Sequence, residues 1–388
     1  MKIAVAPDSF KGCLTALQVC DAIEQGLRAA HADVQVVKVP MADGGEGTVQ
    51  SLVQATGGRL VTRQVEGPLG DPVSATFGLL GDGITAVVEM AAASGLPLVP
   101  TDRRDPSLTT TYGTGQLIAA SLAMGCRKLI VGIGGSATTD GGAGMAQALG
   151  AVMLDAHGQA LGHVGGGALA RVARIDCSGL DPRLCEAQMR VACDVENPLY
   201  GPRGAAHVYG PQKGATAEMV GRLDAGLRVW ARRLAEDLSA DVAKVPGSGA
   251  AGGLGAGLMA FCGATLERGV DIVIDAVRLR DRMRGADLVI TGEGRIDFQT
   301  AFGKTPSGVA DTARDLGIPV VAVGGSIALD ATSLHERNFD ALAPIINEPM
   351  DLDEAMQPER ARSMLAFAGE QIARMVAIQA GGMGRGSE

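Results

Sequence analysis

The stretch that decides the fold class runs from residue 129 to residue 150 and reads LIVGIGGSATTDGGAGMAQALG. It begins with an apolar run, typical of the end of a buried strand, and continues into a glycine-rich turn and a helical pattern. Glycine costs roughly 0.5–1 kcal/mol more than alanine in regular structure. A turn with so many glycines therefore indicates that the backbone approaches another group closely.

Four other apolar runs have the same form, a strand followed by a glycine-rich or acidic turn and then by a helix. They are residues 2–6, 34–39, 288–290 and 320–323. Such near-continuous apolar strands are typical of a parallel sheet covered on both faces. Together with the intervening helices they predict an α/β fold with a Rossmann-like, doubly wound, mostly parallel sheet. Ligands of such sheets bind beyond the carboxyl ends of the strands, where each of these turns would lie.

Two helix starts carry the spacing of a capping box, in which a polar residue is followed three positions later by Glu or Gln. Thr15 and Gln18 have this spacing, and so do Asp43 and Glu46. We therefore expect helices to begin at Thr15 and at Asp43.

The length of the chain predicts more than one domain. At about 150 residues per domain, 388 residues correspond to two or three. Both ends of the chain supply strand–helix units, whereas the middle is rich in glycine and proline. We predict a discontinuous Rossmann-like domain of residues 1–57, 86–150 and 285–388, and a second, inserted α/β domain of residues 58–85 and 151–284.

Composition excludes several classes of function. The net charge of −9 argues against nucleic-acid and membrane-surface binding, both of which favour basic patches. The chain contains no run of 18 apolar residues and its first residues lack a cleavable signal pattern, so we expect a cytoplasmic protein without a membrane span. The oligomeric state, a homo-oligomer included, is left open by the sequence.

One interpretation of the opening stretch is a dinucleotide site. Gly132, Gly134 and Ala137 fit the G-x-G-x-x-G/A fingerprint, and Asp155 lies where a ribose-binding acid is expected. This would indicate a nicotinamide-dependent oxidoreductase. However, the fingerprint requires the helix to begin at its third small residue, whereas the helical pattern begins here near Gly142.

A second interpretation is a phosphate site in which Asp140 caps the helix. Gly141 and Gly142 would then remove the side chains that keep a phosphate from the helix N-terminus, and Ser136 and Thr138 would add hydroxyl donors. The competing interpretation is a tight turn with an ordinary Asp cap. Against it stands a repetition of the pattern, because residues 43–47 read DGGEG and residues 140–144 read DGGAG. Acidic groups would repel a bare phosphate, so a bridging Mg²⁺ is expected.

Further charged residues follow other predicted strands. Asp8, Ser9 and Lys11 after the first strand suit a small hydroxy-acid substrate, although an exposed salt bridge is the alternative. Lys304 precedes a helix start and could meet a phosphate or remain solvated. Asp194 closes an apolar stretch and could be a functional carboxylate or a turn former.

The turn TGEGRID, residues 291–297, adds a cation and two carboxylates. Arg295 is suited to recognising a carboxylate or phosphate, and Glu293 and Asp297 flank it.

Eight motifs in this order resemble the type-1 glycerate kinase family, from about Met1 to Ile346. They are PDSFKG, PMADGGEGT, TTYGTG, IGGSATTDGGAGMAQALGA, CDVENPL, YGPQKGA, ITGEGRID and GKTPSGVA. The resemblance implies two α/β domains with the active site in the cleft between them. It also implies transfer of the γ-phosphoryl group of ATP to D-glycerate, typically at the 2-hydroxyl, giving 2-phospho-D-glycerate and ADP. The residues themselves leave the 2- and 3-hydroxyls both open, and the alternative remains an oxidoreductase acting on glycerate or hydroxypyruvate.

Within this reading each candidate residue receives a role. The expected catalytic residues are Lys11, Asp194 and Asp297. The expected substrate-binding residues are Asp8, Ser9, Lys11, Asp43 and Arg295. The expected nucleotide-binding residues are Gly134, Gly135, Ser136, Thr138, Asp140, Gly141, Gly142, Gly253, Gly255 and Lys304. The expected Mg²⁺ ligands are Asp194 and Glu293.

Overall fold

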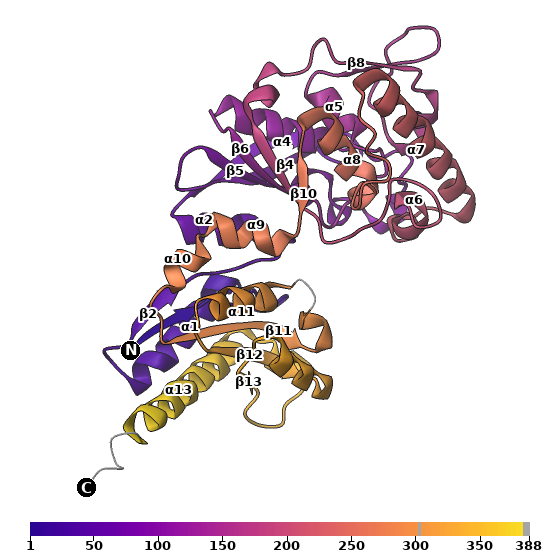
Figure 1. Cartoon of the computed structure of the whole chain (residues 1–388). Coiled ribbons are helices and arrows are strands. Elements are labelled where there is room, and N and C mark those ends of the chain that lie inside the picture. The colour runs from indigo at the N-terminus through magenta and orange to yellow at the C-terminus, as the bar shows by residue number, and fades with distance from the viewer. Residues whose placement is uncertain (302–303, 383–388) are drawn as a thin grey trace. The chain divides into compact units, whose positions relative to one another are not determined.

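The fold is that of a computed structural model, which describes residues 1–301 and 304–382 (Figure 1). Gly303, the first residue of the GKTPSGVA motif, lies outside the described residues. The chain divides into two compact units. The first comprises Met1–Asp43 and Val273–Glu388, and the second comprises Gly44–Ile272. Each unit has one large, mostly parallel sheet, and the predicted α/β class is confirmed.

The first unit contains a five-stranded, all-parallel sheet in the order β13-β12-β11-β1-β2. Its strands are β1 (Lys2–Val5), β2 (Gln35–Lys38), β11 (Leu288–Ile296), β12 (Val320–Ile327) and β13 (Ala341–Pro344). From β1 the chain proceeds to β2 on one side, and the later strands are added on the other. The strand order therefore reverses between β1 and β11, which is where doubly wound sheets bind their ligands.

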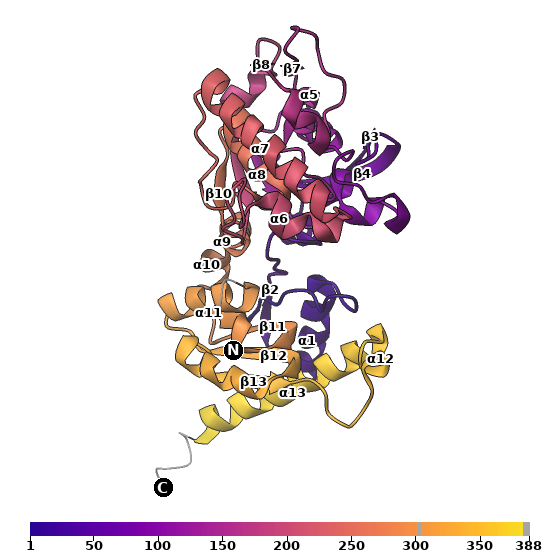
Figure 2. The ribbon, with the colours of Figure 1, turned by 90° about the vertical axis from the view of Figure 1, so that its right-hand side faces the viewer.

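Helices cover both faces of this sheet. They are α1 (Ala16–Ala30), α10 (Leu279–Met283), α11 (Thr305–Asp315), α12 (Leu352–Ala355) and α13 (Pro358–Gly382). Helices α1 and α13 pack side by side on one face, and α11 lies against β11 and β12 (Figures 1 and 2). The predicted capping box of α1 is confirmed, because Thr15 and Gln18 bond each other's backbone N–H groups.

The second unit contains a six-stranded sheet in the order β10-β9-β6-β5-β4-β3 and a small antiparallel pair, β7-β8. The strands are β3 (Arg59–Glu66), β4 (Pro72–Leu79), β5 (Thr85–Glu89), β6 (Lys128–Gly132), β7 (Val152–Leu154), β8 (Arg174–Asp176), β9 (Gln188–Ala192) and β10 (Thr265–Glu267). Strands β5, β6, β9 and β10 run parallel, whereas β3 and β4 form an antiparallel hairpin.

The helices of the second unit surround a core that includes the single tryptophan of the chain, Trp230. They are α2 (Thr48–Thr56), α3 (Ala91–Ser94), α4 (Tyr112–Ala123), α5 (Ala143–Ala148), α6 (Ala205–Tyr209), α7 (Ala217–Leu238) and α8 (Ala250–Cys262). Helix α9 (Gly269–Ala276) carries the chain back into the first unit.

The unit boundaries differ from those expected from the sequence. Residues 44–57 and 86–150 were expected in the Rossmann-like domain but belong to the second unit, and residues 273–284 belong to the first. The reason is strand pairing: β5 and β6 pair with each other and with β4 and β9, so they extend the second sheet. A strand–helix unit has the same local sequence pattern in either sheet, and only these long-range pairings assign it.

Candidate active site

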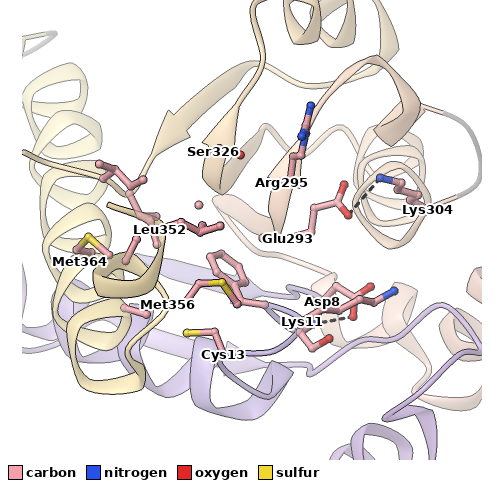
Figure 3. A pocket seen from close by; sticks show the side chains of 18 of the residues that line it. Asp8, Lys11, Cys13, Glu293, Arg295, Lys304, Ser326, Leu352, Met356 and Met364 are labelled. Atoms are coloured by element: carbon pink, nitrogen blue, oxygen red, sulfur yellow. Dashed lines mark hydrogen bonds and ion pairs between the residues drawn. The ribbon is translucent and has the colours of Figure 1, made fainter. Parts of the chain in front are cut away.

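The first unit has a pocket of about 390 Å³ at the carboxyl ends of β1, β11 and β12, where the strand order reverses (Figure 3). This is the edge at which the sequence predicted the site. The pocket brings together seven residues that were predicted from four separate stretches of sequence. They are Asp8, Ser9, Lys11, Asp43, Glu293, Arg295 and Lys304.

Asp8 forms the floor of this polar end, and only 7% of it is exposed. Its carboxylate accepts hydrogen bonds from the N–H group of Ser9 at 2.6 Å and from the hydroxyl of Thr305 at 2.9 Å. Burial, followed by the negative charge of Asp43, raises the pKa of Asp8, and the two hydrogen bonds only partly offset this effect. A nearby cation would therefore stabilise the ionised form of Asp8.

Lys11 extends over the polar end, with 68% of its side chain exposed, and its Nζ lies 3.2 Å from Oδ2 of Asp43. Partial burial lowers the pKa of Lys11, but the charge of Asp43 and their hydrogen bond outweigh it, so the net pKa is raised. Lys11 is consequently a stable cation at neutral pH that can contact an anionic ligand.

Glu293 and Lys304 form a second charged pair in the pocket. Oε1 of Glu293 accepts a hydrogen bond from the Thr300 hydroxyl at 2.7 Å, and Oε2 lies 3.6 Å from Nζ of Lys304. Burial raises the pKa of Glu293, and the charge of Asp8 contributes in the same direction. Lys304 is the N-cap residue of α11, so its ammonium group lies where that helix begins.

Arg295 is the most exposed of these cations, with 73% of its side chain accessible, and its Nε lies 3.4 Å from Oδ2 of Asp297. Asp297 itself does not line the pocket, and its Oδ1 accepts the N–H group of Gln299. Asp297 therefore contacts a pocket residue, Arg295, without lining the pocket itself, and its expected catalytic role stays a prediction.

The other end of the pocket is apolar, and the sequence reading missed it. The residues that line this end are Phe10, Cys13, Ile345, Met356 and Met364. Figure 3 labels Cys13, Met356 and Met364 among them. The last three follow or lie beyond the final recognised motif, and they form no pattern of their own. In the sequence these three residues appear only as part of an excess of apolar residues around a short helix. Such an excess is also typical of a hydrophobic core.

Asp140 lies in the second unit and is fully buried. Its carboxylate accepts hydrogen bonds from the N–H groups of Thr111, Gly142 and Gly144 and from the Thr111 hydroxyl. The N–H group of Ala143 donates to the carbonyl of Asp140. These N–H groups at the start of α5 are therefore paired within the unit. The N-cap residue of α5 is Gly142, not Asp140 as the sequence predicted. The paired N–H groups match the competing interpretation of a tight turn, and nucleotide binding by this turn stays a prediction.

The glycines of this region are explained by close packing. A Cβ on Gly141 would lie 2.5 Å from the ring of Trp230, whose Nε1 donates to the Gly141 carbonyl at 2.9 Å. A Cβ on Gly142, Gly253 or Gly255 would lie 3.0, 2.7 or 2.4 Å from its nearest neighbour. The group that the backbone approaches is thus another part of the same unit.

Gly134 and Gly135 are exposed after β6, and the loop that they begin is held by a buried lysine. Nζ of Lys213 donates to Oγ of Ser136 at 2.7 Å and to the carbonyl of Thr138 at 2.5 Å. Burial lowers the pKa of Lys213 to about 7. The sequence reading gave Lys213 no role, although it stands in the quoted motif YGPQKGA.

Asp194 follows β9 in the second unit, is exposed, and accepts the N–H group of Gly269 at 3.0 Å. Glu293, the other expected metal ligand, belongs to the first unit. Over residues 1–301 and 304–382, no cluster of three or more His, Cys, Asp and Glu side chains could hold a metal ion.

The start of α5 and the hydrogen bonds of Asp155 bear on the dinucleotide interpretation. Helix α5 begins at Ala143, well beyond Ala137, and the carboxylate of Asp155 accepts N–H groups of its own turn, from His157 and Gln159. Neither position fits a dinucleotide fingerprint.

In the described part of the chain, no helix combines the length and the apolarity needed to cross a membrane.

Comparisons with known proteins agree with one another. Residues 3–377 match the model of a family described as the glycerate kinase family. The chain is 53% identical over 357 residues to a glycerate kinase of Bacillus subtilis (strain 168), covering 92% of this chain and 93% of that one. It is 50% identical over 378 residues to a glycerate 2-kinase of Escherichia coli (strain K12), covering 97% and 98%.

A solved structure gives the same result. A crystal structure from Salmonella typhimurium LT2, described as glycerate kinase 2, matches with a TM-score of 0.90 and 50% identity, covering 99% of each chain. These findings give the oxidoreductase interpretation no support.

Proposed function

The chain belongs to the glycerate kinase family, and from this premise we propose that it transfers the γ-phosphoryl group of ATP specifically to the 2-hydroxyl of D-glycerate. A kinase of this family takes ATP as its co-substrate. The description of the E. coli relative as a glycerate 2-kinase favours the 2-position. The products would be 2-phospho-D-glycerate and ADP.

The observation that carries the proposal is the polar end of the pocket in the first unit. Three cations, Lys11, Arg295 and Lys304, line this end together with the buried carboxylate of Asp8 and the half-buried carboxylate of Glu293. Phosphoryl transfer has a loose transition state and depends on positioning and charge neutralisation more than on covalent chemistry. A group of fixed cations at the strand ends supports that reaction.

We assign the cations by exposure and place in the fold. Lys11 and Arg295 reach into solvent and would hold the carboxylate of glycerate, with Ser9 and Asp43 beside them. Lys304 lies at the N-terminus of α11, where the helix dipole also favours an anion, and would contact a phosphate of ATP.

Asp8 and Glu293 fit the requirements of Mg²⁺. Both offer hard carboxylate oxygens, and both have a raised pKa in which burial and a neighbouring carboxylate take part. Mg²⁺ commonly uses one or two carboxylates together with substrate phosphates. Bound there, the ion would neutralise charge on the transferring phosphoryl group.

The remaining expected roles stay proposals. Asp297 and Asp194 are the candidates to accept the proton of the attacking hydroxyl, and Asp194 remains a candidate metal ligand. The Gly134–Ser136 loop remains a candidate for contacting nucleotide phosphates, supported by its exposure and by the lysine that orders it.

Phosphorus NMR of the product tests the proposed position. The protein is incubated with D-glycerate and MgATP, and the ester resonance is recorded with proton coupling. A phosphate on C2 couples to one proton of its carbon and gives a doublet, whereas a phosphate on C3 couples to two and gives a triplet. We expect the doublet. A triplet would contradict the 2-position, and the absence of any ester would contradict the kinase activity.

A matched pair of variants tests the site. In Lys304→Gln we expect the KM for ATP to rise about tenfold, because a charge-assisted contact to phosphate is lost. In Lys244→Gln, an exposed lysine of the second unit, we expect no change. An equal effect of both changes would remove Lys304 from the site.

A further inference from the structure

The pocket of the first unit has more room and a different lining than glycerate requires. Its volume of about 390 Å³ falls in the range of pockets that enclose drug-sized ligands. Phe10, Ile345 and Met364 form a buried apolar floor, with 5%, 3% and 1% of each residue exposed. Glycerate consists of three carbons bearing a carboxylate and two hydroxyls, so it has no apolar surface to place there.

The rim of the apolar end is open to solvent. Leu352 of α12 is 71% exposed, Ile346 is 39% exposed and Met356 is 37% exposed, and all three line the pocket. Single exposed apolar residues are ordinary, but a group of them around a cavity is typical of a ligand site. These side chains would lose water contact only when the cavity is filled.

ATP contains the one group in the reaction that matches this lining. Its purine base is planar with two apolar faces, whereas its ribose and phosphates are polar. Thioether sulfurs, such as those of Met356 and Met364, make favourable contacts with aromatic rings and adapt to their shape. We propose that the apolar end of this pocket binds the purine base of ATP, an assignment that rests on the kinase function proposed above.

The junction of the two ends supports this placement. Gly294, Gly325 and Ser326 line the same pocket as the methionines and the charged residues, and Figure 3 labels Ser326. A Cβ on Gly294 would meet no atom closer than Cα of Phe10 at 3.8 Å, so it would occupy the pocket floor itself. The absence of a side chain keeps the passage open, and Ser326 offers a hydroxyl where the ribose would lie. The phosphates then extend toward Lys304.

The placement also revises the sequence-based assignment. The nucleotide was expected mainly at the Gly134–Gly144 turn, but Asp140 and the glycines that follow it are occupied by packing within the second unit. Lys304 is the one expected nucleotide-binding residue that lies in the pocket. Base, ribose and phosphates can therefore follow one continuous lining in the first unit.

Calorimetric titration of ADP against inorganic tripolyphosphate tests the inference, with the full chain and Mg²⁺ present. In Met356→Glu, and separately in Leu352→Glu, we expect ADP to bind about tenfold or more weakly, because a carboxylate at an apolar surface must be desolvated. Tripolyphosphate has no base, so its affinity should stay within about twofold. The exposed Leu329, which lies outside the pocket and is 95% exposed, supplies the control Leu329→Glu, in which neither ligand should change.

Two outcomes would overturn the inference: unchanged ADP affinity in both pocket variants, or an equal loss for ADP and tripolyphosphate. The measurement needs no turnover of glycerate. A wild-type protein that binds ADP in this way but produces no phosphoglycerate would therefore contradict the proposed function and leave the base assignment standing.

Discussion

Two turns of this molecule share the sequence pattern Asp-Gly-Gly-x-Gly and use their aspartates in different ways. Asp43 is partly exposed and pairs with Lys11 in the pocket of the first unit, whereas Asp140 is fully buried and accepts four hydrogen bonds within the second unit. The pattern specifies a glycine-rich turn in both places. The surroundings decide whether the carboxylate serves a ligand or the fold.

The difference follows from which group caps the next helix. Helix α2 has Gly47 as its N-cap residue, and the N–H group of Val49 donates to the carboxylate of Glu89 at 2.8 Å. The sequence had predicted Asp43 as the cap of a helix start with Glu46, so that prediction is wrong. Helix α5 also has a glycine, Gly142, as its N-cap residue, but there Asp140 accepts the N–H groups of Gly142 and Gly144 itself. A glutamate distant in sequence, Glu89, therefore accepts an N–H group at the start of α2, whereas at the start of α5 Asp140 accepts such groups itself.

The largest expected effect separates the two aspartates. Asp140→Asn should lower the free energy of unfolding by about 3 kcal/mol or more, because an amide NH₂ would face buried donors that now bond a carboxylate. Asp43→Asn should change it by less than about 1 kcal/mol, since the pair with Lys11 is exposed to solvent. Urea denaturation followed by circular dichroism measures both. Similar losses in the two variants would abolish the distinction.

A smaller effect tests the capping glutamate. Glu89→Gln should lower the free energy of unfolding by about 1 kcal/mol, because a neutral oxygen replaces a charged acceptor at the N-terminus of α2. Glu46→Gln, at the exposed position that the capping-box spacing had singled out, should have no measurable effect in the same assay. The reverse order would restore the original prediction of a cap at Asp43.

A pH-dependent effect concerns the two lysines beside these turns, whose pKa values move in opposite directions. Burial lowers the pKa of Lys213 from 10.5 to about 7, against the charge of Asp140, whereas the pKa of Lys11 is raised. Between pH 7 and 9 the unfolded chain therefore binds a proton at Lys213 that the folded chain does not. Stability should rise with pH by at most about 1.4 kcal/mol per unit from this residue.

The lysine comparison is measured by unfolding at pH 7, 8 and 9. We expect the gain with pH to disappear in Lys213→Met and to persist in Lys11→Met, because Lys11 stays protonated in both states over this range. A gain that persists in Lys213→Met would show that Lys213 remains charged when buried.

The parts of the fold predicted correctly depend on local sequence. The apolar runs at residues 2–6 and 288–290 became parallel strands, and Thr15 with Gln18 formed the expected capping box. The assignment of residues 86–150 to a domain differed, because the pairing of β5 and β6 with β9 joins segments far apart in the chain. No local pattern encodes that pairing.

The polar end of the pocket could be predicted from the sequence for a related reason. Asp8, Glu293 and Lys304 follow strands or precede helices, and the carboxyl ends of parallel strands meet at one edge. The apolar end was not accessible, since Met356 and Met364 resemble core residues until the cavity beside them is seen. The burial of Asp140 was equally hidden, because its four donors come from two separate segments.

The position of Trp230 has a practical consequence. It is the only tryptophan of the chain, it is fully buried, and its indole N–H group binds the carbonyl of Gly141. Intrinsic tryptophan fluorescence therefore reports on the second unit alone, at the turn that Asp140 caps. The emission would therefore follow the unfolding of the second unit. The first unit, which contains the pocket, contributes no tryptophan emission, so a fluorophore introduced there would report on it separately.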